Sequence, residues 1–238
     1  MTWYLDVLGS IDSKRSYSRK ELSDILKDYQ PDISVNMCNW AIDQSVKKGL
    51  LFRRGYNAYI LSDGNRLKEY RPDYSQESLR LVKEIKEKYP DITFTVFETL
   101  LMNEFLNHLI GKNTVFVQAE KESSIFVFRY LQELGYSNVL YMPDKKEFRL
   151  YWEPDCVIVT NLVSESPLKN TDPYMITLEK LLVDMIADKV IASTYSLSEL
   201  DEVFELSQKI YRLDQVRMLR YARRRNKEDQ VRQYIGEY

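Results

Sequence analysis

The feature that most constrains the fold is the order of local signals between Ser18 and Leu61. Ser18 precedes RKELSDIL with Glu21 three residues later, which is the capping-box spacing that satisfies exposed backbone donors at a helix start. The stretch YQPD ends that helix, because proline cannot continue it. A second helix is predicted from Ser34 to the glycine at position 49. The spacing of its residues predicts a buried face of Val35, Cys38, Ala41, Ile42, Ser45 and Val46.

Two short strands are predicted after this helix, from Leu50 to Arg53 and from Ala58 to Leu61, with a turn at Gly55. Helix, turn, helix, strand, turn and strand is the order of a winged helix-turn-helix, and the stretch resembles winged-helix transcription factors. In those proteins the second helix enters the major groove and the hairpin lies over the adjacent backbone. The predicted DNA-binding residues are Asn36, Asn39, Trp40 and Lys47 on the helix and Arg53, Arg54, Tyr56 and Asn57 on the hairpin.

These side chains differ in what they can recognise. Asn36 and Asn39 are the candidates for base edges, since an amide can bond adenine bidentately, whereas the two hairpin arginines are suited to phosphates. Asp43 lies on the same predicted face and would repel phosphate if it pointed toward DNA. The alternative is a protein-interaction module, because winged helices also serve that role and hairpin arginines can simply be solvated.

Composition places the chain among soluble globular proteins, with 44% hydrophobic and 29% charged residues. The net charge of -2 does not decide nucleic-acid binding, which depends on where cations lie. Cys38 and Cys156 lack CxxC spacing, so we expect reduced thiols in the cytoplasm. No secretion signal is visible, and no apolar run reaches the roughly 20 residues of a membrane span, so no membrane partner is expected.

The polar stretch from Ser62, SDGNRLKEYRPDYSQES, predicts a linker at residues 63–75 between an N-terminal domain (1–62) and a larger C-terminal domain (76–238). In the larger domain, β-rich stretches alternate with amphipathic helices, which predicts an α/β fold (α+β overall) with a mixed sheet packed by helices. The predicted helices are 76–89, 98–110, 122–134, 178–189, 197–211 and 215–234, and the predicted strands are 92–96, 114–119, 139–142, 147–151 and 156–161.

The sequence offers little for catalysis. GxGxxG and P-loop patterns are absent, so no nucleotide cofactor is expected. The sole histidine, His108, has no second ligand at metal spacing, so we read it as a packed or surface residue and predict no metal site. The alternative is a Mg²⁺-dependent restriction-like nuclease that uses Glu98, Asp155 and a third carboxylate. Such folds carry an acidic-x-lysine signature after the strand carboxylate, which is missing here, so we predict no enzyme.

The last predicted helix is rich in arginine. No acidic residue stands between Asp214 and Glu228. Clustered arginine is typical of nucleic-acid binding, yet arginine stems also cover apolar surface on solvated helices. A second contact with a polyanion or an acidic protein therefore stays open, at Arg217, Arg220, Arg223, Arg224 and Arg225.

The segment TDPYMITLEKLLVDMIADK (171–189) resembles a helix in the C-terminal domain of AbiEi-type antitoxins, the regulators of abortive-infection systems. The matching residues are Thr177, Glu179, Lys180, Leu182, Val183 and Asp184, and Gly55, Tyr59 and Leu61 match the family's wing more loosely. Ile176 stands where that family has proline. The resemblance implies a repressor that binds operator DNA in its own operon and opposes a co-encoded nucleotidyltransferase-type toxin. From the spacing, we expect Lys180 to pair with Asp184 within the helix.

Overall fold

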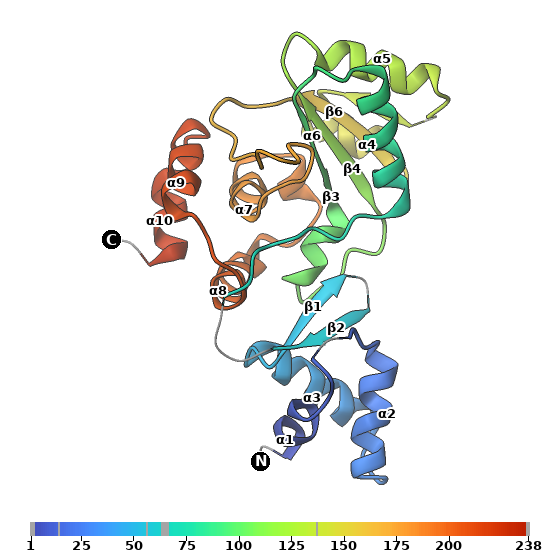
Figure 1. Ribbon diagram of the computed structural model, residues 1–238, viewed down its shortest axis with the longest axis vertical. Coiled ribbons are helices and arrows are strands. Elements are labelled where there is room, and N and C mark those ends of the chain that lie inside the picture. Colours follow the sequence, from blue (N-terminus) through green and yellow to red (C-terminus); the bar gives the residue numbers. More distant parts are fainter. Residues whose placement is uncertain (1–2, 14, 56, 63–66, 137, 237–238) are drawn as a thin grey trace.

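The computed structural model describes residues 3–13, 15–55, 57–62, 67–136 and 138–236, with the side chains of 52–55 outside that description. Figure 1 shows a small N-terminal part of helices and a hairpin below a larger part built around a sheet. The fold is mixed α/β, as the sequence predicts. Among the described residues, none of the helices is both long and apolar enough to cross a membrane.

The N-terminal part consists of three helices and a two-stranded antiparallel hairpin. The first helix was not predicted from the sequence. The second helix, α2 (Arg19–Tyr29), begins at the predicted cap, where Ser18 and Glu21 form both hydrogen bonds of the capping box. Tyr17 forms an isolated antiparallel bridge with Tyr59 of the hairpin, so the segment before α2 adds a second, short pairing to the small sheet. The elements are α1 (Trp3–Gly9), α2 (Arg19–Tyr29), α3 (Val35–Lys47), β1 (Leu51–Gly55) and β2 (Ala58–Leu61).

The C-terminal part is built on a four-stranded sheet of order β3-β4-β6-β5. β3 runs antiparallel to β4, whereas β4, β6 and β5 are parallel. All residues of β3 and β4 are buried, because helices cover both faces. Figure 1 shows the helices α4 (Gln76–Lys88) and α5 (Ser124–Glu133) on one side and α7 (Leu178–Ala187) and α9 (Gln215–Arg224) on the other. The strands are β3 (Phe94–Glu98), β4 (Thr114–Ala119), β5 (Val139–Tyr141) and β6 (Cys156–Asn161).

The helices of this part include three short 3-10 turns. In chain order, the helices and 3-10 turns (η) of this part are α4 (Gln76–Lys88), η1 (Thr99–Glu104), α5 (Ser124–Glu133), α6 (Lys145–Tyr151), α7 (Leu178–Ala187), η2 (Ile191–Ser193), η3 (Leu197–Glu199), α8 (Leu200–Ile210), α9 (Gln215–Arg224) and α10 (Glu228–Ile235).

Three sequence predictions of secondary structure are wrong. Residues 147–151 form part of helix α6 rather than a strand, because Asp144 and Glu147 make a capping box. The helix predicted over 98–110 is only the 3-10 turn η1, since the Asn103 side chain bonds both backbone groups of Ile110 and closes a loop. The helix predicted over 215–234 is divided into α9 and α10 at Asn226, whose φ is 55°.

The segment predicted as a linker packs onto the C-terminal part where the structure describes it. Tyr70 and Tyr74 are buried, and the Tyr74 hydroxyl donates a 2.7 Å hydrogen bond to the carbonyl of Val96 in β3. Lys68 forms a bridge with Tyr211 at the end of α8. Residues 67–75 are therefore fixed to the sheet and to α8. Both cysteines are free and buried, and burial raises the pKa of Cys156 to about 11.

Candidate functional site

The helix α3 is fixed at both ends and buries one face. Ser34 accepts a hydrogen bond from the N–H of Met37 at its start, and Gly49 adopts a left-handed conformation, φ 70°, just past its end. Five of the six predicted inward residues are buried, and Val35 is the exception at 56% exposed. Val35 is in the first turn, where the chain enters the helix from solvent. The opposite face presents exposed Asn36, Met37, Trp40 and Lys47.

Arg19, at the start of α2, binds two side chains in the middle of the solvent-facing side of α3. Its guanidinium donates to the side-chain oxygen of Asn39 (3.0 Å) and to the carboxylate of Asp43 (2.5 Å). Asp43 is thereby paired with a cation, so the repulsion of phosphate expected from the sequence is reduced. Asn39 has its amide oxygen engaged, and a bidentate adenine contact needs both the oxygen and the nitrogen. Asn36, exposed and nearer the helix start, is left as the stronger candidate for a base edge.

The hairpin does not project freely from the molecule. β1 packs against η1 of the C-terminal part. Figure 1 shows the hairpin between the N-terminal helices and the C-terminal part. Asn57, at φ 54°, accepts a 2.9 Å hydrogen bond from the N–H of Arg19, which ties the turn to α2. Tyr56 and the side chains of Arg53 and Arg54 lie outside the described residues.

Aromatic side chains line a groove beside the start of α3. Trp3 and Tyr29 stack with ring centroids 6.0 Å apart, and Tyr4 meets Trp40 edge to face at 5.4 Å. Tyr29 and Trp40 are 65% and 46% exposed. The groove has a volume of about 730 Å³ and is lined by Trp3, Gln30, Asp32, Ile33, Ser34, Asn36, Met37 and Trp40.

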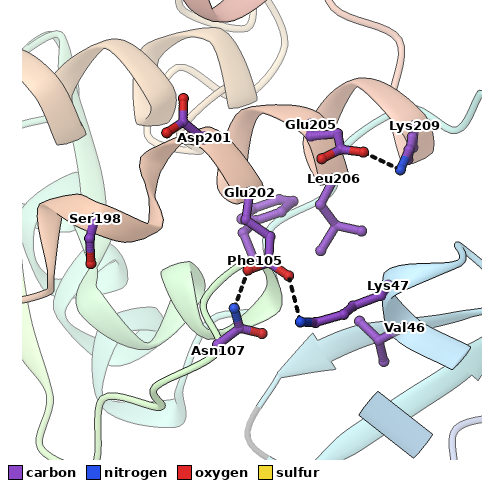
Figure 2. A pocket seen from close by; sticks show the side chains of 10 residues that line it. All are labelled: Val46, Lys47, Phe105, Asn107, Ser198, Asp201, Glu202, Glu205, Leu206 and Lys209. Atoms are coloured by element: carbon purple, nitrogen blue, oxygen red, sulfur yellow. Dashed lines mark hydrogen bonds and ion pairs between the residues drawn. The ribbon is translucent and has the colours of Figure 1, made fainter. Parts of the chain in front are cut away.

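A second cavity, of about 470 Å³, separates the end of α3 from α8 (Figure 2). Val46 and Lys47 come from α3, Phe105 and Asn107 follow η1, and Asp201, Glu202 and Glu205 with Leu206 and Lys209 lie on α8. The Lys47 ammonium lies 4.0 Å from a carboxylate oxygen of Glu202. The other oxygen of Glu202 accepts a hydrogen bond from the Asn107 amide. Lys47 was predicted to contact DNA, and the structure places it beside an acidic helix.

The loop after η1 is held to α8 by Glu199. This buried carboxylate accepts hydrogen bonds from the backbone N–H groups of Asn107 (2.6 Å) and His108 (3.2 Å). It also lies 3.0 Å from the Nδ1 atom of His108. The His108 side chain is 89% exposed, which fits the prediction of a surface histidine. Glu199 and Asn107 were missed by sequence reasoning, because nothing in either segment signals the other.

The arginines of α9 and Arg225, the residue directly after this helix, have partners within the chain. Arg225, expected on a binding surface, is instead 14% exposed and lies 3.7 Å from Asp184 and 3.8 Å from Asp188. Its guanidinium therefore lies against two carboxylates of the protein rather than on an open surface. The other four bind as follows: Arg217 to the carbonyl of Leu168, Arg220 to Glu165, Arg223 to Glu228 and Arg224 to Ser164.

Asp184 belongs to the most buried ionic cluster of the described residues. Lys180 and Asp184 are 0% and 2% exposed and lie 2.5 Å apart, which confirms the pairing expected from their spacing. The Tyr221 hydroxyl of α9 donates to Asp184 at 2.7 Å and lies 3.1 Å from the Lys180 ammonium. Burial lowers the pKa of Lys180, although Asp184 acts in the opposite direction, and burial raises the pKa of Tyr221. The cluster joins α7 to α9 inside the protein.

The carboxylates considered for a nuclease occupy different environments. Glu98 is 1% exposed and accepts four hydrogen bonds, from the N–H and hydroxyl of Ser75, the hydroxyl of Ser78 and the amide of Asn113. Asp155 is exposed, with φ 62°, just before β6. Within the described ranges, no three His, Cys, Asp or Glu residues are grouped so that they could hold a metal. A cation at Glu98 would have to displace the donors that already surround it.

Comparison with curated proteins gives no significant match. One family matches the chain over residues 37–238, a range that starts within α3 and includes the hairpin and the whole C-terminal part. That match covers well over half of the sequence. The chain belongs to this family, DUF6577, which is described as a family of unknown function.

Proposed function

We propose that this protein is a DNA-binding transcriptional regulator whose N-terminal part contacts duplex DNA through α3. The observation that carries the proposal is the environment of this helix. One face is packed against α1 and α2, and the other is open to solvent and presents the Asn36 amide. The order α2, α3, β1, β2 is that of a winged helix-turn-helix, in which this helix is the one that enters the major groove.

In this proposal α3 makes the base contacts, and cations at two positions contact phosphates. Asn36 bonds adenine, while the exposed Val35 and Met37 side chains suit contact with thymine methyl groups. Exposed Lys20 lies beside Arg19 at the start of α2, and exposed Lys47 and Lys48 lie at the end of α3. The hairpin contributes less than the sequence suggested, because β1 packs against η1.

The resemblance to AbiEi-type antitoxins extends the proposal. In this role the protein represses its own operon in the cytoplasm and opposes a co-encoded nucleotidyltransferase-type toxin, without catalysis of its own. The helix that carries the resemblance, α7, supports the C-terminal part through the buried Lys180–Asp184 pair. Co-expression with a nucleotidyltransferase encoded beside this gene tests the role: growth should be restored, and continued toxicity would count against it.

DNA binding is tested by a mobility-shift titration with the duplex upstream of the gene. Asn36→Ala combined with Trp40→Ala removes the amide and an exposed ring from the open face of α3. Binding should weaken about tenfold or more, since one good bidentate base contact contributes about 1–3 kcal/mol. The matched control, Gln132→Ala with Phe126→Ala, removes an exposed amide and an exposed ring from α5 at the other end of the molecule. Equal affinities for both variants, or binding that does not weaken with salt, would contradict the proposal.

A second candidate function is favoured by the groove beside α3. Clustered exposed aromatic and apolar side chains mark protein-interaction sites, and here Trp3, Met37 and Trp40 line one such groove. In that case the protein is a non-catalytic scaffold, and it should bind no nucleic acid even at low salt.

The nuclease alternative is tested by incubating DNA with the protein and Mg²⁺ or Mn²⁺. DNA cleavage that Asp155→Ala abolishes would support it.

A further inference from the structure

The C-terminal end of α3 meets a helix of opposite charge. Three acidic residues of α8, Asp201, Glu202 and Glu205, line the cavity of about 470 Å³. Figure 2 shows Lys47 extending from the end of α3 toward Glu202. Lys47 lies at the end of the stripe that the proposed function assigns to DNA, so the same ammonium has two possible anionic partners, a carboxylate in the chain and a phosphate.

The acidic side of α8 is held in this place. Glu199, immediately before α8, fixes the loop after η1 through two backbone N–H groups. The Asn107 amide of that loop bonds Glu202. On the other side, η1 packs against β1, which is the strand directly after α3. The Glu202 carboxylate is therefore held by the loop and does not depend on Lys47 for its position.

We infer that the acidic face of α8 is an autoinhibitory element that competes with DNA phosphates for Lys47. This inference rests on the proposed DNA binding by α3. A phosphate within hydrogen-bond distance of Lys47 must approach Glu202, whose carboxylate is 4.0 Å from the same nitrogen. Asp201 and Glu205 line the same cavity, where Glu205 also pairs with Lys209 at 2.5 Å. DNA binding through Lys47 must therefore either move its ammonium away from Glu202 or bring a phosphate close to that fixed carboxylate.

The test is a triple variant, Asp201→Asn, Glu202→Gln and Glu205→Gln. It removes three negative charges and keeps the oxygen that accepts the Asn107 hydrogen bond. We expect affinity for the upstream duplex to rise about tenfold at low salt. The slope of log K against log salt should steepen by about 0.9, the value for one additional phosphate contact. Adding Lys47→Met to the triple variant should remove most of the gain.

The matched control is Glu120→Gln, Glu122→Gln and Glu133→Gln, which makes the same change in net charge around α5. Figure 1 shows α5 at the opposite end of the molecule from α3. This control should change affinity less than twofold. An equal gain in both triple variants, or a gain that persists after Lys47→Met, would overturn the inference while leaving DNA binding intact. Absence of binding by the wild type and both triple variants would overturn the proposed function, and the inference with it.

Discussion

Two lysine–carboxylate pairs in this protein carry the same charges but differ in burial and in the distance between their charged atoms. Lys180 and Asp184 are nearly inaccessible and 2.5 Å apart, and the Tyr221 hydroxyl donates a hydrogen bond to Asp184. Lys47 and Glu202 are 50% and 36% exposed and 4.0 Å apart across a cavity between two parts of the molecule. A buried charge that loses its partner cannot turn to water, whereas an exposed one can. The first pair is therefore structural, and the second is free to exchange partners.

The largest expected effect comes from Lys180→Ala. It leaves the carboxylate of Asp184 buried without its nearest cation, so the free energy of unfolding should fall by about 3–5 kcal/mol. The measurement is urea-induced unfolding followed by circular dichroism. Lys209→Ala is a matched control, because Lys209 also pairs with a carboxylate one helical turn away, Glu205, but on the surface. It should lose about 0.5 kcal/mol or less, and similar losses for both would break the comparison.

Glu98 sharpens the comparison, because it is a buried carboxylate surrounded by hydrogen-bond donors. Glu98→Gln places an N–H₂ group against donors from Ser75, Ser78 or Asn113. We expect a loss of about 2–3 kcal/mol in the free energy of unfolding, in the range for hydrogen bonds to a charged group. Glu77→Gln, at an exposed position of α4 next to the donor Ser78, should change stability by less than about 0.5 kcal/mol. A variant of Glu98 as stable as the wild type would show that burial alone does not make a carboxylate structural.

A double-mutant cycle tests the open pair directly. Lys47→Met and Glu202→Gln, alone and together, should show a coupling energy below about 1 kcal/mol in unfolding experiments. The coupling should vanish in 1 M salt, where the Debye length is about 3 Å. A coupling energy of several kcal/mol that persists in high salt would show that Lys47 and Glu202 form a structural pair, as Lys180 and Asp184 do. It would also contradict the exchange of Glu202 for a DNA phosphate as the partner of Lys47.

The smallest effect is expected at low pH. Hydrogen bonds from Arg223 and Arg232 hold the pKa of Glu228 at about 2, below its ordinary 4.5. A carboxylate whose folded pKa is depressed stabilises the protein above its unfolded pKa, and that stability is lost as pH falls. The loss should therefore occur between about pH 4.5 and pH 2. Comparing the wild type with Glu228→Gln in thermal unfolding across this range tests it, and parallel curves would contradict it.

Several local structures were predictable because their causes lie within a few residues. The capping box of Ser18 and Glu21 and the glycine after α3 gave correct helix limits. Lys180 and Asp184 are one helical turn apart, so their pairing was predictable as well. Their burial was not, because charged residues at this spacing usually lie on a helix surface. Only the arrival of Tyr221 and α9 over α7 puts the pair inside the protein.

The candidate site shows the same division. The sequence indicated the solvent-facing stripe of α3, and most of it is exposed. It could not indicate that Arg19 donates a hydrogen bond to the side-chain oxygen of Asn39. Nor could it indicate that Glu202 lies beside Lys47, because more than a hundred residues separate the two in the chain. For the same reason the arginines of α9 looked available for a ligand, while Arg225 lies against Asp184 and Asp188.

The sequence by itself determined the α/β class, the ends of several helices and the face that α3 buries, because caps, prolines and apolar periodicity act within about one helical turn. Only the tertiary structure decided which charges are buried, which are paired and which meet across the cavity beside α8. Those contacts join segments far apart in the chain, and their energies depend on exclusion of water, which becomes defined when the segments pack.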